Sequence, residues 1–261
     1  MNASFDVVIV GGGVTGAAVG YGLAKRGVKT CLVDAVPTFS RASRANMGLI
    51  WCQSKALGCP QFVRWGFASS RAYGKLAAEL KELSGIDTGY APTGGIIPCL
   101  GEAELEARAQ FIEKLRAETE DGTYPASVLS RKELEGMLPK VPFGPEVSGG
   151  IWSDMDGYVD PLHLMFAFRK SFVRLGGTLF AGERVSEVKP SGKGYTVVCG
   201  GRTLECGKAV LAAGLGVRKL AAQLGKDIPV VPNKSQVMLL ERIPADVLPI
   251  PLLGIARTFG G

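Results

Sequence analysis

Near the amino end, the apolar positions form short, nearly unbroken runs and do not alternate with polar ones. The first run, residues 5–10, is followed at once by three glycines at 11–13, which predicts a buried strand entering a tight turn. Small and helix-favouring residues occupy positions 14–26, and a second apolar run at 30–33 ends on Asp34. The pattern therefore predicts a strand, turn, helix and strand in succession.

Further along, apolar residues recur at helical spacing in three segments, and short apolar runs between turn residues indicate strands. The predicted helices are 61–83, 102–120 and 161–175. The predicted strands are 90–100 (one strand or two), 150–153, 178–181, 185–188, 195–199, 202–205 and 208–213, with a hairpin turn at Gly200 and Gly201. Helices and strands mixed in this order predict an α/β fold with two domains that share the chain discontinuously.

Charge and cysteine usage exclude several classes of function. The chain has 261 residues and a formal net charge of +6, but its basic residues are scattered and form no run interleaved with aromatic residues, so we expect no nucleic-acid partner. The six cysteines show neither C-x-x-C nor metal-ligand spacing, and His163 is the only histidine. We therefore expect no metal site.

The sequence contains no recognisable targeting or membrane segment. Residues 1–6 include no basic residue, and the apolar run that follows is too short for a secretory signal. No apolar stretch approaches the roughly 20 residues that a spanning helix requires. We expect a reduced, cytoplasmic protein without a transmembrane segment, and peripheral membrane attachment stays open.

The first strand and helix flank the motif Gly11-x-Gly13-x-x-Gly16. In this context the first glycine makes the turn, the second lets the backbone approach a diphosphate, and the third lets the helix pack closely on the strand. The amino end of the helix then binds the pyrophosphate. Asp34 follows Gly13 by 21 residues and ends the second strand, where a carboxylate accepts hydrogen bonds from an adenosine ribose. The motif predicts a dinucleotide and leaves FAD and NAD as alternatives.

Several longer blocks, in this order and spacing, carry a family resemblance. They are FDVVIVGGGVTGAAVGYGLAKRG at the start, SRASRANMGLIW from Ser40, DGYVDPLHLMFAFRKSFVRLGG from Asp156, AVLAAGLGVRKLAAQLG from Ala209 and P-x-x-x-S-Q-V from Pro232. With these blocks the chain resembles the D-amino-acid oxidase, glycine oxidase and sarcosine oxidase superfamily, which includes opine oxidases and imino-acid dehydrogenases. The resemblance implies FAD as the cofactor.

The resemblance also implies which residues contact FAD. In that family the segment resembling residues 41–49 runs past the FAD diphosphate towards the flavin ring, the position of Val185 brackets the adenine, and a small-residue strand end closes over the cofactor. The expected cofactor-binding residues are Gly11, Gly13, Val14, Thr15, Gly16, Asp34, Ala35, Ala42, Ser43, Met47, Gly48, Leu49, Val185, Ala212, Ala213 and Gly214.

No catalytic residue is assigned, because in this family the flavin takes a hydride from the carbon bearing the amine and the protein orients the substrate, often with an arginine. We interpret His163 as a packing or capping residue rather than an acid or base, and Cys52 and Cys59 as inert thiols.

The resemblance implies a Rossmann-like, three-layer FAD-binding domain (1–85 plus 147–225) interleaved with a mixed-sheet substrate domain (86–146 plus 226–261) that looks truncated at the carboxyl end. The expected function is FAD-dependent oxidation of a C–N bond in a small amino-acid or imino-acid substrate, by an oxidase or a dehydrogenase, with partner subunits left open. The alternatives are an NAD(P)-linked dehydrogenase and a non-catalytic FAD-binding fragment or subunit.

Overall fold

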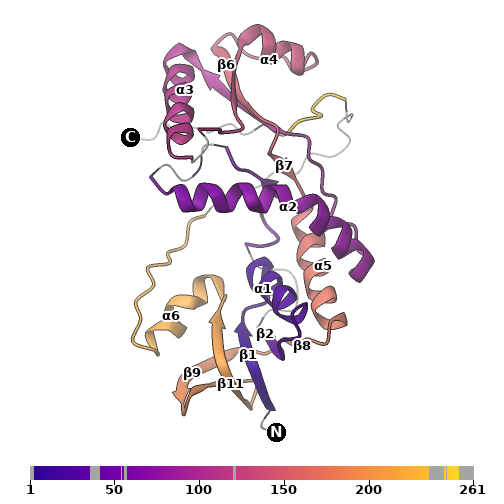
Figure 1. The fold of residues 1–261 in the computed structure, drawn as a ribbon, viewed down its shortest axis with the longest axis vertical. Coiled ribbons are helices and arrows are strands. Elements are labelled where there is room, and N and C mark those ends of the chain that lie inside the picture. Colours follow the sequence, from indigo (N-terminus) through magenta and orange to yellow (C-terminus); the bar gives the residue numbers. More distant parts are fainter. Residues whose placement is uncertain are drawn as a thin grey trace. The chain divides into compact units, whose positions relative to one another are not determined.

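The computed structural model describes residues 3–35, 42–53, 55, 58–119, 122–234, 244 and 246–252. The chain divides into two compact units, each assembled from three segments (Figure 1). Unit 1 comprises Met1–Met47, Ala77–Thr88 and Asp160–Val237, and unit 2 comprises Gly48–Leu76, Gly89–Val159 and Met238–Gly261. Residues 48–76 and 147–159 thus cluster with unit 2, whereas the sequence analysis placed them in the FAD-binding domain.

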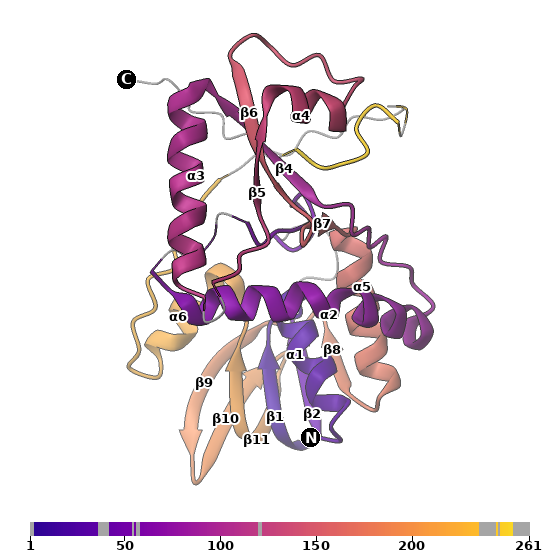
Figure 2. The same ribbon diagram turned by 45° about the horizontal axis from the view of Figure 1, so that its top comes forward.

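Unit 1 is built on a six-stranded sheet with the order β8-β2-β1-β11-β10-β9 (Figure 2). Neighbouring strands from β8 to β11 pair in parallel, and β10 and β9 extend the sheet antiparallel. The strands are β1 (Ala3–Val10), β2 (Thr30–Asp34), β8 (Thr178–Ala181), β9 (Val185–Ser191), β10 (Gly194–Cys199) and β11 (Arg202–Leu211).

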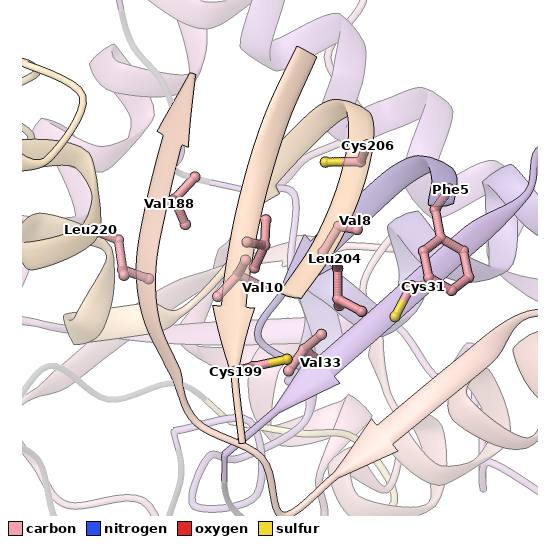
Figure 3. Close-up of a cluster of buried hydrophobic side chains, with 11 residues drawn as sticks. Phe5, Val8, Val10, Cys31, Val33, Val188, Cys199, Leu204, Cys206 and Leu220 are labelled. Carbon is pink, nitrogen blue, oxygen red and sulfur yellow. The ribbon is translucent and has the colours of Figure 1, made fainter. Parts of the chain in front are cut away.

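Both faces of this sheet are covered, because successive side chains of β1 point to opposite sides. Ile9 packs in one cluster with Phe172 of α5 (Pro161–Arg174) and with residues of α1 (Val14–Ala24). Val8 and Val10 pack in the opposite cluster, which includes Leu220 of α6 (Val217–Ala222), a helix preceded by the short 3-10 helix η1 (Gly214–Gly216) (Figure 3). Unit 1 is therefore a helix, sheet and helix sandwich, as expected of a Rossmann-like domain.

Unit 2 contains a three-stranded antiparallel sheet with the order β4-β6-β5. Helix α3 packs on the face that carries Ile97, and α4 packs on the face that carries Ile96. Leu252 forms a parallel bridge with Ile96, so this unit combines both pairing directions. The elements are α2 (Pro60–Ser84, whose last turns belong to unit 1), β4 (Gly95–Leu100), α3 (Gly101–Ala117), β5 (Ser127–Ser130), α4 (Arg131–Met137), β6 (Val147–Ser153) and the two-stranded pair β3 (Leu49–Ile50) and β7 (Gly157–Tyr158).

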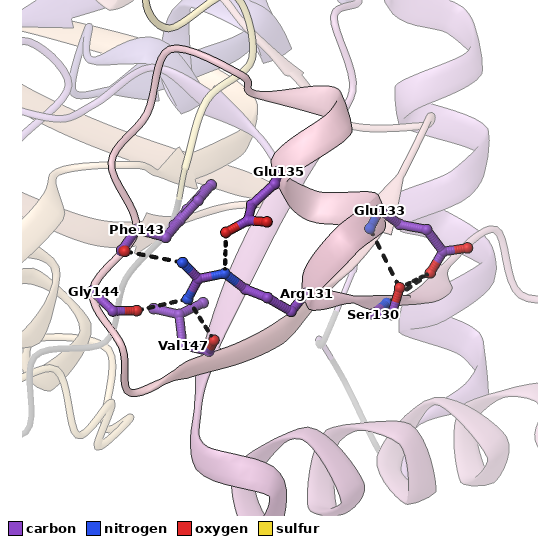
Figure 4. A network of polar contacts seen from close by, with 7 residues as sticks. All are labelled: Ser130, Arg131, Glu133, Glu135, Phe143, Gly144 and Val147. Atoms are coloured by element: carbon purple, nitrogen blue, oxygen red, sulfur yellow. Dashed lines mark hydrogen bonds and ion pairs between the residues drawn. The ribbon is translucent and has the colours of Figure 1, made fainter.

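Helix α4 is short and is stabilised at its start by local polar contacts (Figure 4). Ser130 and Glu133 form a capping box, in which each side chain accepts a hydrogen bond from the other residue's backbone N–H. The Arg131 guanidinium binds the carbonyl oxygens of Phe143, Gly144 and Val147 at 2.6 to 3.0 Å. These contacts fix the proline-rich connector that leads into β6.

Most of the predicted elements are present, with one correction and several omissions. The segments 202–205 and 208–213, predicted as two strands, are a single strand, β11. The elements that were not predicted are strands β3, β5 and β7, the 3-10 helix η1 and helices α4 and α6. The hairpin turn is confirmed, with positive φ at Gly200 and Gly201. Among the helices that the structure describes, none is both long and apolar enough to cross a membrane.

Candidate dinucleotide site

The first and last glycines of the β1–α1 loop are fixed by backbone contacts. Gly11 has a φ of +106°, and its N–H donates to the Val33 carbonyl oxygen at 2.8 Å. A Cβ atom on Gly11 would lie 2.3 Å from the Ala212 carbonyl oxygen, and one on Gly16 would lie 1.8 Å from the Gly11 carbonyl oxygen. Since no side chain tolerates such distances, the loop can close against the β11 end and pack on α1 only with glycine at both positions.

The two middle glycines face side chains. A Cβ atom on Gly12 would lie 2.8 Å from Asp34 Oδ2, and one on Gly13 would lie 2.8 Å from Ser43 Oγ. Gly12, which the motif treats as variable, is therefore needed for the packing of the Asp34 carboxylate. Gly13 meets only the tip of a small side chain, so its missing Cβ leaves the backbone accessible.

The amino end of α1 carries no negative charge. Gly13 is its N-cap and offers no side-chain hydrogen bond, and the first turn contains no acidic residue. The Val14 N–H donates to Ser43 Oγ at 3.0 Å, and Thr15 in the same turn is exposed. A helix start with this composition keeps its positive dipole end uncompensated, which favours an anion such as a diphosphate.

The segment after β2 contributes Ser43 to this loop. Asn46 Nδ2 donates to the carbonyl oxygens of Ala42 and Ser43 at 3.1 and 3.0 Å, which closes a tight local turn. Ala42 is exposed, and Met47 is 62% exposed, which is unusual for so large an apolar side chain. Residues 36–41, including the predicted flavin-segment residue Arg41, lie outside the described residues.

Gly48 and Leu49, the last two residues of that predicted segment, belong to unit 2. Gly48 is buried with a φ of +67°, and its carbonyl oxygen accepts a hydrogen bond from the Val159 N–H at 2.9 Å. Leu49 pairs with Tyr158 in the β3–β7 ladder. Their conformation is thus fixed within unit 2.

Asp34 is buried, with only 5% of its surface exposed. Its carbonyl oxygen accepts hydrogen bonds from the N–H groups of Gly182 and Glu183 at 2.7 and 3.0 Å. Its Oδ2 atom lies 3.3 Å from Nη1 of Arg169, a residue of α5 that is 8% exposed. The sequence analysis missed Arg169, although its position four residues after Met165 and three before Phe172 places it on the buried face of a helix.

The remaining predicted contacts lie at strand ends of the same sheet. Ala212 donates its N–H to the Val10 carbonyl oxygen at 2.8 Å, and Gly214 begins η1 with a φ of +55°. Ala35 and Ala213 are half-buried. Val185 begins β9 and packs against the core cluster that contains Val8 and Val10, so its side chain serves the core. The structure therefore brings together Gly11, Gly16 and Ala212, and separately Gly13, Val14 and Ser43.

These residues fit a dinucleotide. Gly13 has no Cβ to cover the backbone at the start of α1, the helix start is free of acidic residues, and a buried acid ends the neighbouring strand. In a parallel sheet these features meet at the carboxyl ends of β1 and β2, where such ligands bind.

A second buried carboxylate lies in unit 2. Asp156 is 1% exposed and accepts hydrogen bonds from the Cys52 N–H at 2.5 Å and from Gln53 Nε2 at 2.7 Å. Gln53 Nε2 also donates to the Gly95 carbonyl oxygen at 2.9 Å. Burial raises the pKa of Asp156 to about 6, although these hydrogen bonds oppose the shift. The cluster fixes the segment that follows β3.

Cys52 is partly buried and Cys59 is exposed, and His163 lies in the first turn of α5. Burial and the nearby Asp156 raise the pKa of Cys52 to about 11, which keeps this thiol protonated at neutral pH. His163 is exposed, and its N–H is capped by Asp160 Oδ1 at 2.8 Å. In the part of the chain that the structure describes, no group of three or more His, Cys, Asp or Glu residues could hold a metal ion.

Comparisons with known proteins agree with this geometry. A family model described as "DAO: FAD dependent oxidoreductase" matches residues 6–260. The chain is 35% identical to an opine oxidase subunit of Agrobacterium tumefaciens (strain Ach5) over 238 residues, which are 91% of this chain and 63% of that protein. It is 28% identical to glycine oxidase of Geobacillus kaustophilus (strain HTA426) over 253 residues, 97% of this chain and 64% of that protein.

The fold is also that of a solved relative. The crystal structure of glycine oxidase from Geobacillus kaustophilus superposes with a TM-score of 0.78 at 28% identity, covering 85% of this chain and 59% of that chain. The chain therefore spans less than two thirds of the length of these relatives.

Proposed function

Because this chain belongs to the DAO family of FAD-dependent oxidoreductases, we propose that unit 1 binds FAD and that the protein oxidises a C–N bond in a small amino or imino acid. The observation that carries the proposal is the glycine loop at the start of α1, with the buried Asp34 at the end of the adjacent strand. The family match gives no support to the NAD(P)-linked alternative.

In this proposal each part of the site binds a different part of the cofactor. The first turn of α1 binds the diphosphate, Asp34 binds the adenosine ribose, and Val185 lies beside the adenine. The segment from Ala42 to Leu49 approaches the flavin, and Ala212, Ala213 and Gly214 close over the cofactor.

When bound, FAD supplies the oxidising chemistry, because it accepts a hydride from the carbon that bears the amine. The chain's own residues bind and orient: the N–H groups at the start of α1 offset the diphosphate charge, and the buried carboxylate of Asp34 accepts hydrogen bonds from hydroxyl groups. The absence of an ionisable side chain from the loop fits this role, since none is needed to move a proton there.

The names of two relatives bear on substrate and partners. One is a glycine oxidase, and the other is one of the subunits of an opine oxidase. We propose that the substrate is an amino acid with a primary or secondary amine, and that the protein works together with a second polypeptide. The proposed second polypeptide is tested by purifying the protein from its native source, with flavin absorbance to follow the protein and specific activity measured at each step. A single polypeptide with full specific activity would contradict the proposal.

The assignment of Asp34 is tested by titrating FAD into the apoprotein. We expect Asp34→Ala to weaken FAD binding by about 1 to 3 kcal/mol, the cost of losing a hydrogen bond to a charged group. Glu187→Ala is the matched control, because Glu187 is a half-exposed acid on β9 of the same unit. Unchanged FAD affinity in Asp34→Ala would remove Asp34 from the site.

The catalytic part is tested by anaerobic reduction of the bound flavin. We expect the visible flavin absorbance to bleach with at least one member of a panel of glycine, sarcosine, proline, hydroxyproline, D-amino acids and an opine. Bound FAD that no compound reduces would indicate a non-catalytic FAD-binding chain.

A further inference from the structure

The buried arginine of unit 1 has no role in the site proposed so far. Arg169 lies on α5, and its side chain is only 9% exposed. Its Nη1 atom lies 3.3 Å from Asp34 Oδ2, and the two residues are 135 positions apart in the sequence. Lys170, its neighbour on the same helix, is exposed.

The stability of the fold alone does not explain this pair. A guanidinium stays protonated when buried, so Arg169 requires an anionic partner. Taking both charges out of water costs much of their mutual attraction, and apolar residues of similar size often stabilise a core as well or better. A buried ion pair at the carboxyl end of β2 is therefore better explained by a role in orienting the Asp34 carboxylate.

The Asp34 carboxylate is held from two sides. Oδ2 lies 2.8 Å from the position that a Cβ of Gly12 would occupy, so the carboxylate packs directly on the glycine loop. Arg169 binds the same oxygen from α5. The Asp34 backbone is fixed as well, through the N–H groups of Gly182 and Glu183. A carboxylate fixed in this way is preorganised to accept hydrogen bonds, which lowers the entropy cost of binding a ligand.

We propose that Arg169 is a positioning residue, which holds the Asp34 carboxylate oriented towards the ribose hydroxyls of the adenosine half of the cofactor. This inference rests on the proposed FAD site. It places a specificity determinant on α5, outside the glycine loop and the strand that carry the recognisable motif. The expected effect on nucleotide binding is largest in recognition of the ribose, because Arg169 contacts the Asp34 carboxylate.

The test compares the binding of FAD, ADP and 2′-deoxy-ADP to the apoprotein by calorimetry. The parent should prefer ADP to 2′-deoxy-ADP about tenfold, the effect of one hydrogen bond to a charged group. Arg169→Met should weaken FAD and ADP binding about tenfold and bring the ratio of the two nucleotide affinities close to 1. Arg169→Lys should restore part of the ratio, and Lys170→Met, the exposed neighbour, should leave all three affinities unchanged.

A double-mutant cycle with Asp34→Asn separates positioning from general damage. If Arg169 acts through Asp34, the double variant should discriminate between ADP and 2′-deoxy-ADP no worse than either single variant does. Should Arg169→Met lose its helical circular dichroism, Arg169→Lys carries the comparison, because it keeps the charge and loses the planar fork of donors.

The outcomes are distinct. Equal weakening of ADP and 2′-deoxy-ADP by Arg169→Met, with the parental ratio retained, overturns the inference and leaves Arg169 a structural residue. If Arg169→Met binds FAD as tightly as the parent does, the inference about Arg169 is also overturned. The proposed function still stands in that case, because the parent binds FAD. A parent chain that binds no FAD overturns the proposed function and the inference together.

Discussion

A Cβ atom on Gly16 would lie 1.8 Å from a backbone oxygen, whereas one on Gly13 would meet only the hydroxyl of Ser43. Gly13 has a φ of −65° and a ψ of −177°, which any residue adopts. The fold therefore needs Gly16 for packing, while nothing in the polypeptide itself demands Gly13. The glycine pattern in the sequence predicts the loop, and the atoms around each glycine separate its structural from its binding role.

We expect Gly13→Val to abolish FAD binding and to keep most of the secondary structure. The Ser43 side chain can move aside for the new methyl groups, but a diphosphate on the backbone cannot. Gly22→Ala, in α1, is the control, because its Cβ would meet only Arg26 Nη1, at 3.6 Å, just beyond the end of that helix. Visible absorbance and far-ultraviolet circular dichroism of the purified variants give the answer. A Gly13→Val protein as yellow as the parent would make this glycine structural.

Asp156 should make stability depend on pH in the direction opposite to most carboxylates. Its folded pKa is raised from 3.8 to about 6, chiefly by burial. Between these values the folded protein holds a proton that the unfolded chain has released. The contribution of Asp156 to stability is thus fully present below pH 4 and is lost as the pH rises through 6, a change of up to about 3 kcal/mol.

The measurement is the free energy of unfolding in urea from pH 4 to 7 for the parent, Asp156→Asn and the control Glu146→Gln. Other carboxylates add their own slopes, so the difference in free energy between parent and Asp156→Asn is the informative quantity. We expect that difference to change across the window, whereas the difference between parent and Glu146→Gln, which alters an exposed residue, should stay nearly constant. A constant difference between parent and Asp156→Asn would contradict the raised pKa.

Asp34 and Arg169 differ in whether a sequence alone can assign their roles. Asp34 was predicted as a ribose ligand, because its distance from the glycine motif and its place at a strand end are local features. Arg169 is brought to it only by the packing of α5 on the sheet, across 135 positions. Helical spacing places Arg169 on a buried face but cannot name its partner. Whether Asp34 binds ribose stays a prediction.

At the scale of elements, the main error concerned β11. The sequence predicts a break at Gly207, yet the strand runs from Arg202 to Leu211. Its first half pairs with β10 antiparallel and with β1 in parallel, and its second half continues along β1. Glycine is tolerated there because neighbouring strands supply the hydrogen bonds. Pairing partners decide the length of such a strand, and they are distant in sequence.

Helix α5 should depend on its N-cap. Asp160 Oδ1 accepts hydrogen bonds from the N–H groups of Leu162 and His163, both at 2.8 Å. We expect Asp160→Ala to lower the free energy of unfolding by about 0.5 to 2 kcal/mol. Lys170→Ala is the control, since it keeps the capping acceptor and shortens an exposed side chain of the same helix. Thermal or urea unfolding measures both, and equal effects of the two variants would show that the cap contributes little.

At the scale of the molecule, the two units divide the chain at points that apolar spacing does not mark. Helix α2 contains one such point, because it contributes Val63 and Phe67 to a core cluster of unit 2, whereas Glu79 pairs with Lys25 in unit 1. Apolar spacing predicts that a helix is amphipathic, but it does not tell which core each turn joins. A single helix can therefore belong to two units that the sequence shows as one.

The two-unit organisation predicts where FAD protects the backbone from hydrogen exchange. A ligand at 100 times its Kd stabilises the folded state by about 2.7 kcal/mol, and the slowest-exchanging amides report that change. We expect the largest protection at residues 11–16, 42–49 and 212–214, which line the proposed site, and little direct protection at β5 and α4 in unit 2. Exchange measured by mass spectrometry with and without FAD, on the parent and on Gly13→Val, provides the comparison. Protection that centres on residues 127–137, or that persists in Gly13→Val, would place the ligand elsewhere, because those amides share no element with the glycine loop.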